Sequence, residues 1–355
     1  MKRLVFAAAA ALAATLNAAD KTIDGAIEAG LGFLASKQAE DGHFSDPQMP
    51  ALTALPLWAM TAGGRGKTDG ARKAADFVLK TQRPDGGFYV PKPGRGGSGL
   101  GNYNTSVCVS ALFDSGLAPV KAILDARTYI AGSQLTGDDT MAGGFGYDRL
   151  SRRRYADMSN SAYAFDAMRR TEKAEEFRPA GQKKVDLDWE KALRYVESMQ
   201  VKDGEMKGGF VYNDRTAQAG SQTNSSGRVQ LRAFGSMSYA GVLSMCHAKL
   251  TREDPRVRSA LEYCAKHWTL EENPGMGSQG LYYYFDILAR ALDASRVATF
   301  KGPDGTEIDW KKELSKRIIA LQQEDGSWVN DNNRFWENDP VLVTSFAVLT
   351  LSLCR

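Results

Sequence analysis

The sequence is poor in cysteine, with four in 355 residues, and beyond its N-terminus it has no apolar run long enough to span a membrane. Four cysteines in a chain of this length do not make a disulfide-rich scaffold. Cys108, Cys246 and Cys354 lie in apolar stretches, where we expect small buried side chains. Cys246 and Cys264 could form a disulfide after export, but the sequence does not determine this pairing.

The sequence also lacks a surplus of charge and the patterns of common cofactor sites. Its net charge is +3, and the basic residues are spread along the chain, which excludes the basic stripe of a nucleic-acid-binding protein. The glycine-rich segment Lys92–Gly101 lacks the G-x-x-x-x-G-K-[ST] spacing of a phosphate-binding loop. Cys264 and His267 have ligand spacing, but no second pair accompanies them, and a structural zinc needs four ligands. We therefore expect no nucleic acid partner, no metal and no cofactor.

The N-terminus has the pattern of a secretory signal peptide. A basic segment, Met1–Arg3, precedes an apolar run, Leu4–Leu16, and small residues follow at the expected cleavage site. The run is shorter than a spanning helix requires. We expect residues 1–19 to be the signal peptide and residues 20–355 to form one domain. The mature protein is expected to be exported, either to a periplasm or out of the cell.

A short turn recurs along the chain, each time between two helical patterns. Aspartate tolerates the first turn position, glycine supplies a positive φ, and an aromatic residue follows that can pack against both helices. The copies are Ser36–Phe44, Lys80–Phe88, Gly132–Phe145, Ser198–Phe210, a degenerate copy at His267–Leu281 and a last copy within Ile318–Leu353. Self-similarity at such a period is typical of a repeat architecture.

The helices predicted on either side of these turns fall into two classes. The first helix of each pair is amphipathic; in 188–199, for example, Trp189, Val196 and Met199 share one face. The second helix is apolar or small on all sides, which indicates burial. Six pairs of outer and inner helices, without a polar capping repeat, favour an all-α fold that closes into a twelve-helix (α/α)6 toroid.

The same repeats resemble those of the prenyltransferase and squalene-cyclase superfamily. The residues that carry the resemblance are Gln38/Asp41-Gly42/Phe44, Gln82/Asp85-Gly86-Gly87-Phe88, Gly143-Gly144-Phe145, Gly208-Gly209-Phe210 and Gln323/Asp325-Gly326/Trp328. The resemblance covers nearly the whole mature chain. It implies an (α/α)6 toroid with a central cavity, lined by the inner helices and open near their N-termini.

The resemblance also implies catalytic residues that this sequence does not fully supply. Terpene cyclases of the superfamily that start by protonation use a D-x-D-D motif, and Asp157 matches its first position, whereas Ser159 and Asn160 replace the other two carboxylates. Protein prenyltransferases hold zinc with Asp, Cys and His, but the matching segments Gly235–Tyr239 and Val343–Phe346 contain none of these residues. Neither known reaction is therefore expected.

What remains is a set of polar and aromatic side chains near the starts of the inner helices. Such rings can stack on sugars, contact isoprenoids or stabilise cations. The candidate ligand-binding residues are Asn102, Tyr103, Asn104, Tyr147, Asn160, Ser236, Tyr239, Tyr282, Tyr283, Trp336 and Asp339. Asp148 and Asp157 are the candidate catalytic carboxylates. The alternative is that the aromatic candidates are core residues and the polar candidates are helix caps.

Three insertions fall between a turn and its inner helix, at Lys92–Gly101, Arg149–Asp157 and Ala217–Arg228. Insertions at one place in each repeat gather on one face, often the binding face. The densest basic cluster consists of Arg149, Arg152, Arg153 and Arg154. It is either a solvated loop or a binding site for a phosphate or an acidic glycan.

Three classes of function stay open, because a fold does not determine a function. The preferred hypothesis is an exported protein that binds an apolar, isoprenoid-like or elongated ligand in its central cavity. The alternatives are a terpenoid-cyclase or prenyltransferase-like enzyme with a non-standard site, and a glycan-active toroid enzyme that uses Asp148 and Asp157.

Overall fold

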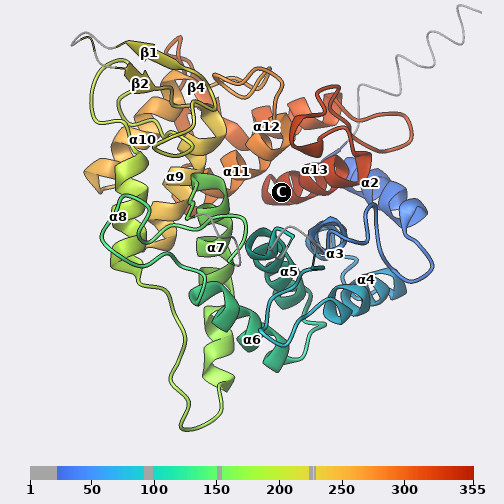
Figure 1. Ribbon diagram of the computed structural model, residues 1–355. Coiled ribbons are helices and arrows are strands. Elements are labelled where there is room, and N and C mark those ends of the chain that lie inside the picture. Colours follow the sequence, from blue (N-terminus) through green and yellow to red (C-terminus); the bar gives the residue numbers. More distant parts are fainter. Residues whose placement is uncertain (1–21, 92–98, 150–153, 224–226, 228) are drawn as a thin grey trace, which may run out of the picture.

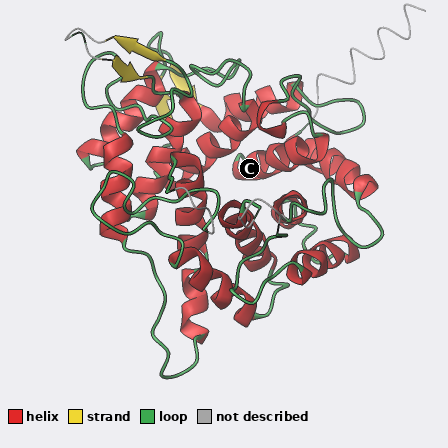
Figure 2. Ribbon diagram, viewed as in Figure 1, coloured by secondary structure: helices red, strands yellow, loops and turns green. Residues whose placement is uncertain are grey.

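The computed structural model describes residues 22–91, 99–149, 154–223, 227 and 229–355. Most of this chain is helical (Figure 2). The first members of the pairs are α2 (Ile23–Lys37), α4 (Asp69–Lys80), α6 (Val120–Ala131), α8 (Trp189–Met199), α10 (Pro255–Lys266) and α12 (Trp310–Ala320). The second members are α3 (Ala51–Ala62), α5 (Gly101–Ser115), α7 (Met158–Arg170), α9 (Gly235–His247), α11 (Leu281–Ala294) and α13 (Pro340–Leu353).

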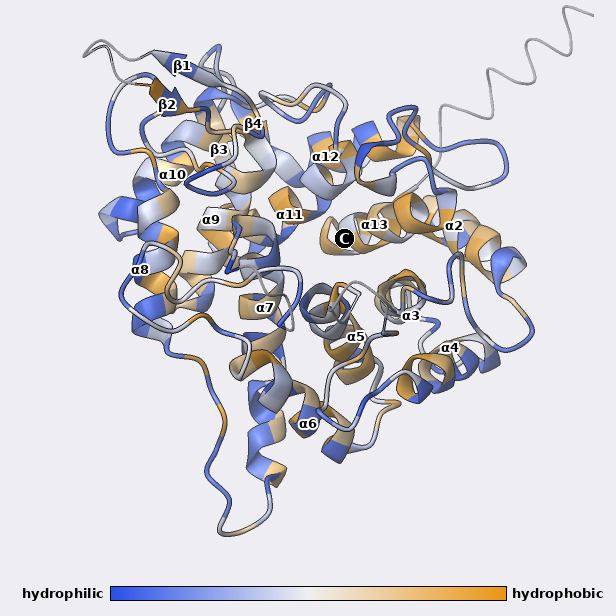
Figure 3. Ribbon diagram, viewed as in Figure 1, coloured by the Kyte–Doolittle hydropathy of each residue, from blue (hydrophilic) through white to orange (hydrophobic). Residues whose placement is uncertain are grey.

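The second members form a closed inner ring, and the first members lie outside it (Figure 1). Each inner helix packs against the next, and α13 packs against α3, which closes the ring. Inner helices such as α3 and α13 are apolar along most of their length, whereas outer helices such as α4 and α8 alternate between polar and apolar faces (Figure 3). The predicted (α/α)6 toroid is therefore confirmed.

The glycine of each regular turn lies against the backbone of the next outer helix. At Gly143, with φ +94°, an added Cβ would lie 2.1 Å from the Lys191 carbonyl oxygen of α8. At Gly208, with φ +91°, it would lie 2.0 Å from the Ser259 carbonyl oxygen of α10. Both the positive φ and this close approach exclude a side chain. The turn motif thus holds neighbouring repeats together.

A glutamine at the end of each regular outer helix ties the same two repeats together. The Gln38 Nε2 donates to the Gly42 carbonyl oxygen of its own turn at 3.0 Å and to the Gly70 carbonyl oxygen of α4 at 2.8 Å. The same pair of hydrogen bonds, one to the turn and one to the next repeat, recurs at Gln82, Gln134 and Gln200. One amide therefore satisfies two carbonyl groups that belong to neighbouring repeats.

The last repeat closes the ring onto the first in the same way. The Gln322 Nε2 donates to the Gly326 and Ala26 carbonyl oxygens, both at 2.9 Å. From the sequence, the repeat motif was matched at Gln323, whose Nε2 instead donates to the Leu321 carbonyl oxygen at 3.3 Å. The bridging glutamine of this repeat is Gln322, which stands four residues before the turn glycine, as Gln38 and Gln82 do in their repeats.

The aromatic residue after each regular turn is fixed by a hydroxyl group of the inner helix. The Trp328 backbone N–H donates to the Thr344 Oγ1 at 3.1 Å, and the Phe145 N–H donates to the Ser161 Oγ at 2.9 Å. The same bond is made by Phe44, Phe88 and Phe210. These five aromatic side chains are fully buried. Each turn is thus anchored both to its own inner helix and to the next repeat.

The degenerate fifth repeat uses different contacts. In place of a glutamine, Arg317 of α12 reaches back to the fifth turn, where its Nε donates to the Leu270 carbonyl oxygen at 3.2 Å and its Nη2 pairs with Glu271 at 2.6 Å. A guanidinium therefore ties the fifth and sixth repeats.

Strands occur only as two short hairpins in the described residues, one of β1 (Ser221–Thr223) with β2 (Val229–Leu231) and one of β3 (Thr299–Lys301) with β4 (Glu307–Asp309). The four cysteines are free thiols, so Cys246 and Cys264 are not bridged. None of the described helices is both long and apolar enough to cross a membrane. The predicted signal peptide lies outside the described residues.

Candidate functional site

The ring encloses a cavity of about 560 Å³ near the N-termini of the inner helices. Every inner helix contributes to its wall, and the outer-to-inner connections form its mouth. The lining residues are Leu52, Leu100, Tyr103, Tyr147, Ser159, Tyr163, Tyr212, Gln218, Phe234, Ser236, Met237, Asn273, Gly280, Tyr283, Asn333, Arg334, Phe335, Trp336, Glu337, Leu342 and Phe346. A concave, largely aromatic site of this size is typical of small-molecule binding.

Four aromatic rings form a continuous ladder across the cavity. Tyr103 of α5 meets Tyr163 of α7 edge to face, with ring centroids 5.2 Å apart. Tyr163 lies 6.0 Å from Tyr283 of α11, and Tyr283 lies 6.3 Å from Phe346 of α13. Burial raises the pKa of all three tyrosines, so their hydroxyl groups stay protonated and neutral. The ladder therefore offers a ligand uncharged aromatic surface.

The mouth of the cavity carries a strained aromatic pair. Phe335 and Trp336 both have left-handed backbone conformations, with φ of 61° and 64°. Both rings are about half exposed although they belong to the cavity wall. Such conformations cost about 1–3 kcal/mol each in residues other than glycine. The connection between α12 and α13 thus holds two large rings in the opening.

Glu337 is the one carboxylic acid among the described residues that line the cavity. Its Oε1 accepts from the Tyr283 backbone N–H at 2.8 Å, and its Oε2 accepts from the Asn330 Nδ2 at 2.6 Å. Burial raises its pKa, although these hydrogen bonds act in the opposite direction. Because the α11 N-cap is Gly280, which has no side chain, Glu337 supplies the cap of that helix instead. Both of its oxygens therefore have a structural role.

The far end of the ring is filled by buried charges rather than by apolar side chains. The Arg290 Nη2 lies 2.5 Å from the Asp166 Oδ2, and its Nη1 lies 3.4 Å from the Asp286 Oδ2. The His247 Nε2 lies 3.1 Å from the Asp166 Oδ1. Burial alone would raise the pKa of Asp166, but Arg170, Arg290 and His247 outweigh it and hold this pKa well below its usual range. The prediction that α7 and α11 are apolar on all sides was wrong at these positions.

Asp157 lies beside the cavity but not in its wall. It is fully buried and caps α7, where its Oδ1 accepts from the Asn160 backbone N–H and its Oδ2 from the Asn160 Nδ2, both at 2.8 Å. Burial raises its pKa to about 6, although hydrogen bonds from Asn160, Tyr212 and Tyr155 oppose the rise. The Tyr212 hydroxyl lies 3.0 Å from the Tyr147 hydroxyl, and both rings line the cavity. Tyrosines therefore separate this carboxyl group from the cavity.

The raised pKa of Asp157 predicts a specific pH dependence of stability. In the unfolded chain an aspartate has a pKa of about 4, so between pH 4 and 6 the folded state binds more protons there than the unfolded state. This group then makes the free energy of unfolding fall as the pH rises through that window. Asp157→Asn should remove this pH dependence. The free energy of unfolding of the variant minus that of the parent should therefore increase by on the order of 2 kcal/mol between pH 4 and pH 7.

Urea denaturation of both proteins at several pH values measures this difference. The Asn160 side-chain amide can turn so that its Oδ1, which has no partner among the described residues, accepts from the new amide. Other titrating groups are common to both proteins and cancel. Parallel stability curves for the two proteins would show that Asp157 titrates normally.

The structure divides the predicted ligand-binding residues into two groups. Five of them line the cavity: Tyr103, Tyr147, Ser236, Tyr283 and Trp336. Six lie outside its wall: Asn102, Asn104, Asn160, Tyr239, Tyr282 and Asp339. The roles of the first group in binding remain a prediction.

The residues outside the wall have other contacts that explain their positions. The Asn104 Oδ1 accepts from the Ala51 backbone N–H at 3.2 Å at the start of α3, and the Asp339 Oδ1 accepts from the Val341 N–H at 2.8 Å at the start of α13. The Asn102 Nδ2 donates to the Gly146 carbonyl oxygen at 2.8 Å. Tyr282 is buried within the helical layers, and the buried Tyr239 borders a separate pocket beside α10. Apart from Tyr239, these side chains are caps and core residues, which is the alternative stated from the sequence.

Asp148 and the described part of the arginine cluster border a separate, smaller pocket. Arg154 makes a bidentate pair with Asp139, at 2.7 and 2.9 Å, and this hydrogen bonding lowers the pKa of Asp139 to about 2. Arg149 lies over the Tyr129 ring at 5.6 Å. Neither guanidinium lines the central cavity. Arg152 and Arg153 lie outside the described residues, as do parts of the other two insertions.

Several cavity residues were not predicted. Tyr163 and Phe346 lie deeper in the inner helices than the starts that were considered, and Glu337, Phe335 and Asn273 lie on connections. The helical spacing from Ser159 to Tyr163 and from Leu342 to Phe346 is the signal that could have found the first two, because residues four apart share a face.

Comparisons with known proteins agree with this architecture. No protein-family model matches the chain. A squalene–hopene cyclase of Alicyclobacillus acidocaldarius is 45% identical over 42 residues, which span 12% of this chain and 7% of that protein. The type II terpene cyclase MstE from Scytonema has a TM-score of 0.56 at 14% identity, over 93% of this chain and 97% of its own. A GH76 α-mannanase of Bacteroides thetaiotaomicron has a TM-score of 0.58 at 10% identity, over 94% and 95%.

The resemblance stated from the sequence is thus supported by the fold. The similar structures include a complex of MstE with geranylgeranyl dihydroxybenzoate, with a TM-score of 0.53 at 14% identity. At such identities the likeness shows the toroid alone, and a toroid serves both a terpene cyclase and a mannanase. The chain therefore has a terpene-cyclase-like toroid fold.

Proposed function

From this fold and cavity, we propose that the protein is exported and binds an elongated apolar ligand of the isoprenoid type in its central cavity. The observation that carries the proposal is the ladder of Tyr103, Tyr163, Tyr283 and Phe346, which crosses the cavity from four inner helices. Aromatic and aliphatic walls gain free energy by removing apolar ligand surface from water. A ligand with a long apolar body gains most from such a wall.

Polar groups concentrate at the mouth, which indicates how the ligand is oriented. Gln218, Asn333 and Arg334 lie on the connections that form the mouth, whereas Tyr163, Met237 and Phe346 come from the inner helices. A ligand with a polar head and an apolar tail would therefore place the head at the mouth. One similar toroid, MstE, is known with a geranylgeranyl compound bound. The isoprenoid chain of that compound supports the ligand class proposed here.

The charges around the cavity favour binding over the two catalytic alternatives. Asp157, which matches the first position of the protonating motif, lies behind tyrosines and does not line the cavity. Glycoside hydrolysis requires two carboxyl groups on either side of the scissile bond. Of the described wall residues only Glu337 has one, and both of its oxygens accept hydrogen bonds from the protein.

A cavity-filling substitution tests the binding site directly. Ser159 lies at the start of α7 and faces the cavity, so Ser159→Trp should place an indole in the space that the ligand needs. We expect the affinity for tritiated geranylgeraniol to fall at least about tenfold, since a lost contact worth about 1.4 kcal/mol has that effect. Equilibrium dialysis measures the affinity.

Ser36→Trp is the matched control, because Ser36 is exposed on the outer helix α2. It should bind geranylgeraniol like the parent protein. Equal affinities of the parent and Ser159→Trp would place the ligand elsewhere. Binding of manno-oligosaccharides but not of geranylgeraniol by the parent would instead support a glycan ligand.

A further inference from the structure

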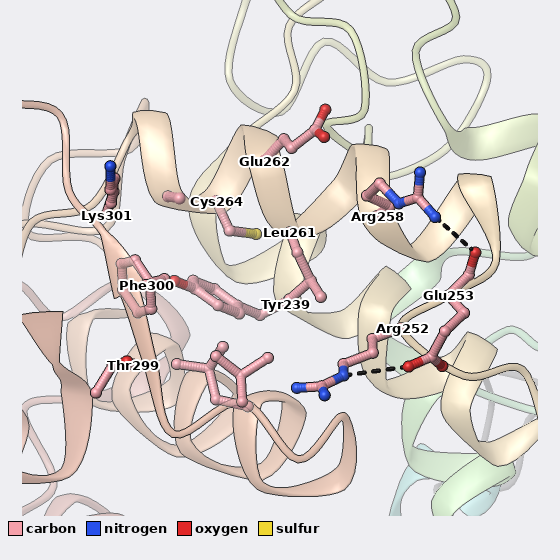
Figure 4. A pocket seen from close by; sticks show the side chains of 13 residues that line it. Tyr239, Arg252, Glu253, Arg258, Leu261, Glu262, Cys264, Thr299, Phe300 and Lys301 are labelled. Atoms are coloured by element: carbon pink, nitrogen blue, oxygen red, sulfur yellow. Dashed lines mark hydrogen bonds and ion pairs between the residues drawn. The ribbon is translucent and has the colours of Figure 1, made fainter. Parts of the chain in front are cut away.

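A second pocket, of about 530 Å³, lies between the outer helix α10 and the β3–β4 hairpin (Figure 4). It shares no lining residue with the central cavity. Its apolar walls include Leu261 and Cys264 of α10, Leu292 of α11 and Phe300 of β3. The connections that border it run from an inner helix to the next outer helix, whereas the mouth of the central cavity is formed by the opposite connections. The two spaces are therefore independent sites.

The wall of this second pocket contains a buried polar group without a partner. Tyr239 is only 1% exposed, and its hydroxyl group has no hydrogen-bond partner within the described part of the chain. Its ring is tilted against Tyr284 at a centroid distance of 5.8 Å. Burial raises its pKa well above the usual range, so the hydroxyl remains a donor. A buried hydroxyl that lacks a partner is costly, and an oxygen of a bound ligand would satisfy it.

The rim of the second pocket carries three basic residues, Arg252, Arg258 and Lys301, and two acidic residues, Glu253 and Glu262. The Arg252 Nε lies 3.3 Å from the Glu253 Oε1, and both side chains are more than half exposed, so this pair is weak and its guanidinium can take another partner. A guanidinium binds a carboxylate or sulfonate through parallel hydrogen bonds.

We propose that this second pocket binds a small amphipathic anion. The apolar body of the ligand lies against Leu261, Leu292 and Phe300, an oxygen of the ligand accepts from the Tyr239 hydroxyl, and its anionic group lies at the basic residues of the rim. The site does not depend on the ligand of the central cavity. It explains why Tyr239 carries a hydroxyl where the packing alone would accept phenylalanine.

Dansylglycine is a suitable probe, because it combines an aromatic body, sulfonyl oxygens and a carboxylate, and its fluorescence rises in apolar surroundings. Tyr239→Phe should weaken its binding about threefold to tenfold, the usual effect of one lost hydrogen bond. This variant removes only an unpaired oxygen, so the fold should be unaffected. Dansylamide, which lacks the carboxylate, should bind the parent protein more weakly than dansylglycine.

Two tryptophan substitutions locate the probe. Thr299 is exposed on β3 at the edge of the second pocket, and Thr299→Trp should abolish dansylglycine binding by filling the entrance. Gln218→Trp narrows the mouth of the central cavity and should leave this binding unchanged. The proposal is overturned if the parent does not bind dansylglycine, if Tyr239→Phe and Thr299→Trp bind it like the parent, or if Gln218→Trp alone removes the binding.

Discussion

Replacing Gly326 with alanine should lower the free energy of unfolding by at least about 3 kcal/mol. Gly326 has a φ of +87°, and a Cβ there would lie 2.5 Å from the Ala29 carbonyl oxygen of α2. The substitution therefore combines backbone strain with a clash against a rigid helix. Because this turn joins the last repeat to the first, the clash would separate the two ends of the ring.

Gly305→Ala is the matched control for this prediction. Gly305 has a similar φ of +83°, but nothing lies within 4 Å of the position of its added Cβ. The free energy of unfolding of Gly305→Ala should fall only by the cost of the left-handed conformation, about 1 kcal/mol. Guanidinium denaturation of the parent and both variants measures the difference. If the two variants lose the same free energy, the contact between Gly326 and α2 does not hold the ring closed.

Replacing Arg290 with methionine should cost about 3–5 kcal/mol of folding free energy, because the buried Asp286 loses the guanidinium that it pairs with and the buried Asp166 loses one of its three cationic neighbours. Asp166 and Asp286 are both almost fully buried, and Arg290 lies between them. Methionine keeps the apolar stem of the side chain, so the loss is mainly electrostatic. The loss should be largest near neutral pH and shrink as the carboxyl groups become protonated in acid.

Arg170→Met provides the comparison within the same cluster. Arg170 also pairs with Asp166, at 3.3 Å, but its side chain is 30% exposed. Partial solvent screening should limit its loss to about 1 kcal/mol. Denaturation at pH 7 and pH 5 separates the two variants. If Arg290→Met is as stable as Arg170→Met at pH 7, the far end of the ring is not held by this ion pair.

The sequence was sufficient to predict the helices and their layers. The turn motif recurs because each copy makes the same contacts, a glycine against the next outer helix and a glutamine across two repeats. An amphipathic helix has only one face to bury, so α8 and α10 had to be outer helices, and the apolar α13 had to be inner. Local pattern and global fold agree, which is why a repeat can be identified without a relative.

The cavity wall was harder to predict, because a side chain's direction depends on the rotation of its helix. Tyr282, Tyr283 and Tyr284 are consecutive in α11, but only Tyr283 faces the cavity. Successive residues of a helix point about 100° apart. A residue next to a cavity residue in the sequence therefore points to a different side of the helix. Tyr282 was predicted to contact the ligand for this reason, but it lies in the core.

The buried ions were missed for a different reason. Asp286 and Arg290 stand four residues apart in an otherwise apolar helix, which is a visible signal for a pair on one face. Their partner Asp166 is in another helix, and nothing in the local pattern indicates that α7 and α11 meet across the ring. Contacts between repeats that are distant in sequence require the closed structure.

The proposed function requires that the ring of inner helices holds an elongated apolar ligand. The most direct measurement is mass spectrometry of an organic extract of the protein purified under native conditions, with Ser159→Trp purified in parallel as the matched control. We predict an isoprenoid or similar lipid at close to one molecule per chain in the parent and a strongly reduced amount in Ser159→Trp. Equal amounts in both proteins, or a parent that carries no lipid and binds no geranylgeraniol, would contradict the claim.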